Sequence, residues 1–188
     1  MVQEVQQRHG RLYRPSRDGR VFHAMTAVTG VAPGTSIGTT APFSLHNPPG
    51  SGVTIAIQKV VMGYVSGTLG AGVISHCVNT NLSEAVPTGT AITERSAIVG
   101  GGGYAAAKGV ALTTSTLANA PVPIRPFASL QASLASTAVA PWQIQDDVDG
   151  AILLPEGGSY SPQGTTAAGS SPLVVFGVTW EEIPTDVD

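Results

Sequence analysis

The sequence predicts an all-β protein, and three observations lead to this. Turn-forming residues are dense, because 23 Gly and 14 Pro fall among 188 residues and leave little room for helices. β-Branched residues dominate the runs between the turns. The turns recur about every 8 to 15 residues, a spacing typical of a β-sandwich, jelly roll or barrel. We expect a jelly-roll-like β-sandwich with an extended N-terminal arm.

The chain divides into an arm, residues 1–20, and one domain, residues 21–188. The arm is polar and has no strand pattern. Its arginines recur every third residue, which could suit one face of a helix, but Gly10, Pro15 and Gly19 interrupt that pattern. We therefore expect an extended arm, and both an ordered arm lying on a neighbouring molecule and a frayed terminus remain open.

Strands are expected wherever apolar and β-branched residues run between turns. Residues 53–65 form the strongest one, because Val53, Ile55 and Ile57 alternate with polar or small residues. The alternation blurs at Lys59–Val61, which predicts a β-bulge. Residues 72–79 follow a Gly-rich turn and are expected to pair with this strand. The other expected strands are residues 21–28, a segment within 41–52, and residues 90–99, 108–117, 142–148, 151–155 and 172–183.

Three segments need separate comment. Residues 129–140 have helical spacing at their leucines, and a short helix and a strand connection both remain open. The glycines at 100–103 predict a flexible loop. Trp142 and Trp180 are expected to anchor a core or an interface, and Trp180 shares one face of an alternating terminal strand with Val174, Phe176 and Val178.

Charge is scarce and unevenly placed. Charged residues make up 11% of the chain, well below the roughly 25% of ordinary soluble domains, which indicates a surface that is neutral or covered by a partner. The arm holds five arginines against Glu4 and Asp18 and carries a net charge of +3. Beyond Arg125 there are eight acidic residues and no Lys or Arg. This polarity favours contact between the arm of one copy and the acidic part of another.

Features that direct a chain out of the cytoplasm are absent from the sequence. The N-terminal residues contain no apolar stretch of the kind a secretory signal has. No apolar run approaches the ~18 residues needed to span a bilayer. Cys77 is the single cysteine, so no intrachain disulfide can form. We expect a chain made in the cytoplasm, without membrane contact.

Catalytic and metal-binding patterns are weak. The histidines lack the spacing of a metal site, and a nucleophile pair with Cys77 would need a distant His. His76 and Cys77 are adjacent, which in a strand sends them to opposite faces, and we expect a buried Cys77 beside a His76 that faces a polar environment. The glycine run lacks a GK[ST] end, and GxSxG is absent.

Acidic residues give only two further leads. The segment QDDVDG, residues 145–150, is interpreted as a solvated turn, with a calcium ion at a subunit interface as the alternative. Glu84, Glu94 and Glu156 could serve as paired carboxylates only if folding brings them together, and aromatic residues that stack sugars are scarce around them. We expect no cofactor and no enzymatic activity.

Several segments resemble a recurrent type of tailed-bacteriophage virion protein. An arm ending in GRVF precedes a Thr-rich strand, and the LxNPxGSG-like turn at residues 45–52 precedes a long apolar strand ending GYVSGTLGAG. LLPEGGSY, residues 153–160, and VVFGVTWEEIP, residues 174–184, resemble the last hairpin of viral jelly-roll modules. The resemblance covers about half of the chain and implies a structural, non-catalytic protein. Because its motifs are turns, it assigns no functional residues.

The expected function is a capsid decoration (cement) protein of a bacteriophage virion, which binds the major capsid protein or other virion proteins. It would act as a homo-oligomer, with a trimer as the expected symmetry. A tail-fibre or tail-associated host-binding module, using loops such as 100–107, is the alternative, and a small hydrolase is a remote one. We expect the arm to bind an acidic protein surface and not nucleic acid. The expected partner-binding residues are Arg8, Arg11, Arg14, Arg17 and Arg20.

Overall fold

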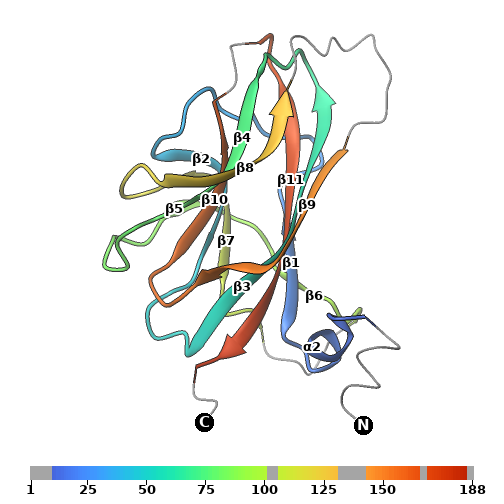
Figure 1. The fold of residues 1–188 in the computed structure, drawn as a ribbon, viewed down its shortest axis with the longest axis vertical. Helices are drawn as coiled ribbons and strands as arrows, with labels where there is room; N and C mark the ends of the chain where they lie inside the picture. The colour runs from blue at the N-terminus through green and yellow to red at the C-terminus, as the bar shows by residue number, and fades with distance from the viewer. Residues whose placement is uncertain (1–9, 101–105, 131–142, 166–168, 186–188) are drawn as a thin grey trace.

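The computed structural model describes residues 10–100, 106–130, 143–165 and 169–185. Two antiparallel sheets pack face to face, so the predicted β-sandwich is confirmed (Figure 1). The elements are α2 (Tyr13–Arg17), β1 (Val21–Met25), β2 (Thr40–His46), β3 (Val53–Ser66), β4 (Gly72–Val78), β5 (Thr88–Ala91), β6 (Arg95–Ser96), β7 (Val110–Thr116), β8 (Val122–Leu130), β9 (Gln143–Leu154), β10 (Ser159–Gly164) and β11 (Leu173–Pro184).

The two sheets share the strands almost evenly. Sheet A has the order β6-β1-β11-β3-β9, and sheet B has the order β5-β7-β2-β10-β4-β8. The first four strands alternate between the sheets, and so do the last four. Each early strand pairs with a late one: β1 with β11, β2 with β10, β3 with β9 and β4 with β8. The chain therefore follows one long antiparallel ribbon that is rolled up until β11 also pairs with β3 and β10 with β4.

The segment between β4 and β8 extends both sheets. β7 pairs with β2, and the fully exposed β5 pairs with β7 at the margin of sheet B. β6 pairs with β1 at the margin of sheet A. This segment is an insertion at the closed end of the ribbon, and residues 101–105 of it lie outside the described part of the chain.

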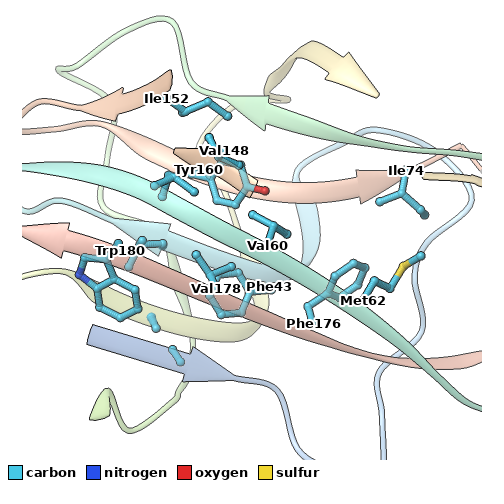
Figure 2. Packing of buried hydrophobic residues seen from close by; sticks show 14 of the residues in the cluster. Phe43, Val60, Met62, Ile74, Val148, Ile152, Tyr160, Phe176, Val178 and Trp180 are labelled. Atoms are coloured by element: carbon cyan, nitrogen blue, oxygen red, sulfur yellow. The ribbon is translucent and has the colours of Figure 1, made fainter. Parts of the chain in front are cut away.

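The core lies between the sheets. Alternation places Val174, Phe176, Val178 and Trp180 of β11 inward, and all four are buried as predicted. Figure 2 shows Trp180, Phe176 and Met62 among the side chains that fill the space between the two sheets. The ring centroids of Trp180 and Phe22 lie 6.0 Å apart, which joins β1 to this cluster. Each fully buried side chain of this size stabilises the fold by roughly 1.5–3 kcal/mol.

The β3 bulge is real but lies slightly before the predicted position. The pairing of β3 with both neighbours shifts between Ile57 and Lys59: Gln58 is the extra residue against β11, whereas against β9 the extra residues lie in β9, between Asp147 and Ile152. Opposite it, Asp149 and Gly150 of β9 have φ values of +56° and +75°. Asp and Gly tolerate this left-handed region better than other residues do. The irregular segment turns Asp149 toward the arm.

Four sequence-based expectations need correction. The arm is not extended throughout, because Tyr13–Arg17 form a helical turn with Pro15 inside its first turn, where a missing N–H does no harm. The segment 72–79 pairs with β8 and β10, not with β3, because β3 and β4 lie in opposite sheets. The segment 90–99 contains two short strands, β5 and β6, which belong to different sheets.

The fourth correction concerns the late strands. The described residues of the predicted strands 142–148 and 151–155 form one strand, β9, because its bulge bends the chain without ending the pairing with β3. β8 and β10 were not predicted. Of the segment 129–140, only Ser129 and Leu130 are described, and they end β8. Trp142 lies outside the described residues.

Among the residues that the structure describes, no helix combines the length and the apolar character that crossing a membrane requires.

Candidate functional site

The arm is anchored on the outer face of sheet A. A guanidinium nitrogen of Arg11 donates to Gln58 Oε1 at 2.8 Å and also pairs with the carboxylate of Asp149. Arg20 pairs with Glu181 at 3.3 Å. In Figure 1, α2 lies beside the end of β1, next to β6. The arm thus covers one end of the outer face and places two of its cations over acids of β9 and β11.

The predicted partner-binding arginines therefore separate into groups. Arg11 and Arg20 contact acidic residues of their own chain. Arg14 and Arg17 approach only Asp18, at 3.9 and 3.7 Å, and their side chains are 47% and 62% exposed. Arg8 lies outside the described residues. Binding of the arm to another molecule stays a prediction, and Arg14 and Arg17 are the described arginines available for it.

The arm changes the electrostatic environment of Glu181. Burial beneath the arm raises the pKa of its carboxyl group, and the charges of Arg20 and Arg11 act in the opposite direction. Gln58 also donates to Glu181, at 3.4 Å. The arm therefore shields the Glu181 carboxylate from water and also places positive charge beside it.

Beyond the arm, the outer face of sheet A is more apolar. The strand registers arrange its side chains in rows that cross β1, β11, β3 and β9. One row contains His23, Thr179, Lys59 and Asp147, and the next contains Met25, Gly177, Val61 and Gln145. In the first row, Lys59 and Asp147 form an ion pair at 3.1 Å.

A groove of about 490 Å³ runs along this face beside β11. Gly177 lies on its floor, while Met25 and Val61 form its two walls. Val175 lines it further along β11, and Arg95 of β6 lies at its rim. Met25, the last residue of β1, is 50% exposed, although it is a large apolar side chain. We regard this groove and the adjoining arm as the candidate functional site.

A second polar cluster lies inside the sandwich. His76 of β4 is fully buried and points toward sheet A, where its ring nitrogens contact polar groups, as expected. Its Nε2 lies 2.7 Å from Asp146 Oδ2, and its Nδ1 lies 2.7 Å from the hydroxyl of Tyr160. Arg125 also pairs with Asp146, and the ring of Phe127 packs 4.7 Å from that of His76. The cluster joins the edge strands β8 and β9 across the sandwich.

The electrostatics of this cluster favour a neutral histidine. Burial lowers the pKa of His76, and Asp146 only partly opposes this effect. A neutral ring donates its Nε2–H to the Asp146 carboxylate and accepts the Tyr160 hydroxyl at Nδ1. Burial also raises the pKa of Tyr160, so that hydroxyl keeps its proton. Each of these donors therefore has an acceptor, as is usual for polar groups that contribute to stability inside a protein. The cluster links the two sheets by hydrogen bonds.

Another His–hydroxyl pair does not have the geometry of a catalytic centre. Nδ1 of the buried His46 lies 3.0 Å from the hydroxyl of Ser159. Among the residues that the structure describes, its Nε2 has no hydrogen-bond partner, so no carboxylate orients the ring as in a nucleophile–base system. Cys77 is fully buried, and desolvation raises the pKa of its thiol to about 11. Such a thiol forms little thiolate and reacts slowly.

The acidic residues have separate roles. Within QDDVDG, Asp146 binds His76, Asp147 pairs with Lys59, and Asp149 pairs with Arg11, so the three carboxylates do not converge. Within the described ranges, no group of three or more His, Cys, Asp or Glu side chains is placed to hold a metal ion.

Two of the three glutamates considered in the sequence, Glu156 and Glu94, accept backbone N–H groups. Glu156 accepts the N–H groups of Gly50 and Gly52 at 2.8 and 2.9 Å, which fixes the turn before β3. These bonds lower the pKa of its carboxyl group. Glu94 accepts the N–H of Ala111 at 2.8 Å.

Comparison with known proteins gives no relative: no family model, no curated protein and no solved structure matches the chain.

The sequence did not reveal the groove. Its one signal is Gly177, which interrupts the outward-facing side chains of an otherwise regular strand. Glycine inside a strand marks a bulge, a bend or a close approach by another molecule.

Proposed function

We propose that this chain is a structural protein of a tailed-bacteriophage virion, most specifically a decoration protein that binds the major capsid shell as a homo-oligomer and performs no catalysis. The observation that carries the proposal is the rolled ribbon, in which β1 pairs with β11, β2 with β10, β3 with β9 and β4 with β8. We interpret this pairing as a jelly roll, a fold frequent among viral capsid proteins. The resemblance of the turn motifs to virion proteins supports the same conclusion.

Jelly rolls also occur in lectins and cupins, so the fold alone does not separate a scaffold from an enzyme. The side chains between the two sheets distinguish these two functions. A cupin-like enzyme holds its site inside the roll. Here the space between the sheets contains a cluster of apolar side chains, including Phe43, Met62, Phe176 and Trp180. Beside this cluster, the buried His76 binds the partly exposed Asp146. This packing supports a scaffold that works through its outer surfaces.

The surface supports assembly. The outer face of sheet A combines an apolar groove with exposed amide side chains of Gln143 and Gln145. Low overall charge weakens repulsion between copies. Arg14 and Arg17 remain available to an acidic surface of the shell. The trimer expected from the sequence remains a prediction.

Cryo-microscopy of virions that encode this chain tests the proposal. We expect density for the β-sandwich at regular, symmetry-related positions on the outside of the shell. Density at the tail alone would instead support the host-binding alternative. Absence of the chain from purified virions, by mass spectrometry, would reject a structural role in the particle.

A further inference from the structure

The starting point is Gly177, whose lack of a side chain has no explanation among the residues that the structure describes. It lies in the middle of β11, and its φ is outside the left-handed region that favours glycine. A Cβ built there would meet only Met25 Cγ, at 3.9 Å, which is ordinary van der Waals contact. Because glycine weakens a strand interior, its position on the floor of the groove indicates close approach by another molecule.

The rows of the outer face show which surface fits this groove. If the line between β11 and β3 is the centre of the face, the groove lies on the β11 side. Val61 stands in the same row on the β3 side. The hollow over Gly177 and the side chain of Val61 therefore lie on opposite sides of the centre line, at equal distances from it.

We propose that the outer faces of sheet A from two copies of this chain pack together about a two-fold axis that runs along the strands between β11 and β3. This rotation exchanges the two sides of the face. Val61 of each copy then enters the groove over Gly177 of the other. The contact is isologous, because the same residues meet twice.

The same rotation also brings opposite charges together at the two sides of the face. Arg95 and His23 lie on the β6–β1 side, and Asp147 lies on the β9 side. The axis brings the flank with Arg95 of one copy opposite the flank with Asp147 of the other. Lys59 already pairs with Asp147, so this charge contact mainly sets orientation. An axis perpendicular to the strands would instead place like flanks together.

The area is close to that of a standard contact when the surface of the arm, which covers one end of the face, is included. Four strands about 4.8 Å apart and a strand of twelve residues rising ~3.3 Å each give a face on the order of 800 Å², including the end under the arm. A standard interface buries about 800 Å² on each partner.

Sedimentation of the full chain tests this inference. We expect an oligomer with an even number of chains, which is a dimer or, if the trimer expected from the sequence also forms, two trimers joined face to face. Gly177→Val should halve that number by filling the groove, weakening the contact at least about tenfold (about 1.4 kcal/mol). The variant should fold, because valine favours strands and the new Cβ meets no atom closer than 3.9 Å. Val61→Lys provides a second variant, which removes the apolar side chain instead of the hollow.

Gly38→Val is the matched control. A Cβ at Gly38 meets no atom within 4 Å, and the residue bonds through its backbone to Gln163 of sheet B, away from the groove. Its oligomeric state should equal that of the full chain. The inference is overturned if the full chain is monomeric or odd-numbered at about 100 µM, or if Gly177→Val and Val61→Lys both keep the even-numbered state.

The inference rests on the proposed function only in requiring contact between copies, and the two can fail separately. A monomer that still decorates virions overturns the two-fold contact and leaves the function. An even-numbered oligomer that is sensitive to Gly177→Val but absent from virions supports the two-fold contact and overturns the proposed function. If Gly177→Val abolishes binding to the particle while the oligomer is unchanged, the groove receives the shell and not a second copy.

Discussion

Nε2 of His76 lies 2.7 Å from Oδ2 of Asp146, and this contact joins sheet B to sheet A at the edge of the sandwich. Asp146 is the common acceptor of His76 and Arg125. Asp146→Ala should therefore lower the free energy of unfolding by about 2 kcal/mol, because it leaves a buried N–H without an acceptor. Chemical denaturation gives this value.

The neighbouring Asp147→Ala is the matched control for that change. Asp147 pairs with the partly exposed Lys59, and because water screens such surface pairs, its removal should cost far less than that of Asp146. Equal costs for the two alanine variants would contradict a structural role for the buried contact.

Stability should fall as the pH decreases from 7 to 5. Burial lowers the pKa of His76, His46 and His23 below the ordinary value of 6.5. Below pH 6.5 the unfolded chain binds protons that the folded chain resists, so each of the buried His76 and His46 costs up to about 1.4 kcal/mol per pH unit until its folded pKa is reached. The exposed His23 acts in the same direction but contributes less, because water screens it. Above pH 6.5 all three are neutral in both states and contribute no slope.

Thermal unfolding measured at several pH values checks this sign. His76→Gln should reduce the slope between pH 7 and 5, whatever its effect on absolute stability. A folded state that became more stable on acidification in this window would show that the histidines are held protonated instead.

Glu182→Ala should be among the most damaging single changes at a polar residue. The buried carboxylate accepts the backbone N–H groups of Lys108 and Gly109 at 2.8 Å each and the indole N–H of Trp180 at 3.2 Å. Removal leaves three donors without partners, which should cost about 3 kcal/mol. Glu181→Ala, at the adjacent outward position, should cost less, because the desolvation that raises the pKa of Glu181 offsets part of what its pair with Arg20 contributes, and urea denaturation should separate the two variants.

Cys77 should be structural and chemically inert. In the folded chain its burial and raised thiol pKa of about 11 should make alkylation at pH 8 far slower than in denaturant. Cys77→Ala should cost about 1 kcal/mol through the small cavity and leave assembly intact. Rapid labelling of the native protein, followed by mass spectrometry, would contradict this.

Deleting residues 1–20 should weaken incorporation into the particle, and increasing salt should weaken it further by screening the remaining charge contacts. The deletion removes the pairs of Arg11 with Asp149 and Arg20 with Glu181 and uncovers one end of sheet A. The paired change Arg11→Ala with Arg20→Ala separates this loss from that of Arg14 and Arg17. Binding to depleted virions across a salt series measures both.

Two results would change the interpretation of the arm. If the truncated chain binds particles as well as the full chain at every salt concentration, the arm contributes nothing to incorporation. If the full chain binds DNA with a steep salt dependence, the arm faces the genome and the decoration proposal is wrong.

The strands that the sequence predicted are those whose side chains alternate most clearly. β11 and β3 were recognisable because one face of each is apolar and continuous. β8 and β10 were not, because proline interrupts each. Pro162 is tolerated in β10 because β2 pairs with β10 only at Ser159 and Tyr160, and at Pro162 the strand pairs with β4 alone.

The candidate site was less predictable than the fold. Arg11 and Asp149 were both noted as charged residues, but they are 138 positions apart, and only the bulge at Asp149–Gly150 brings them together. Sequence reasoning could assign the sign of the charges in each region. It could not pair them, because local periodicity carries no information about which strands become neighbours.

The pairing of β1 with β11 sets an order of events during translation. Val21 pairs with Glu181, so β1 leaves the ribosome long before its partner exists. At 5–20 residues per second, the interval is on the order of 10–30 s. Throughout it Phe22 has no Trp180 to pack against, and the nascent chain exposes an apolar strand. Chaperone capture in this interval should therefore influence the yield of the protein more than the equilibrium stability of the finished sandwich does.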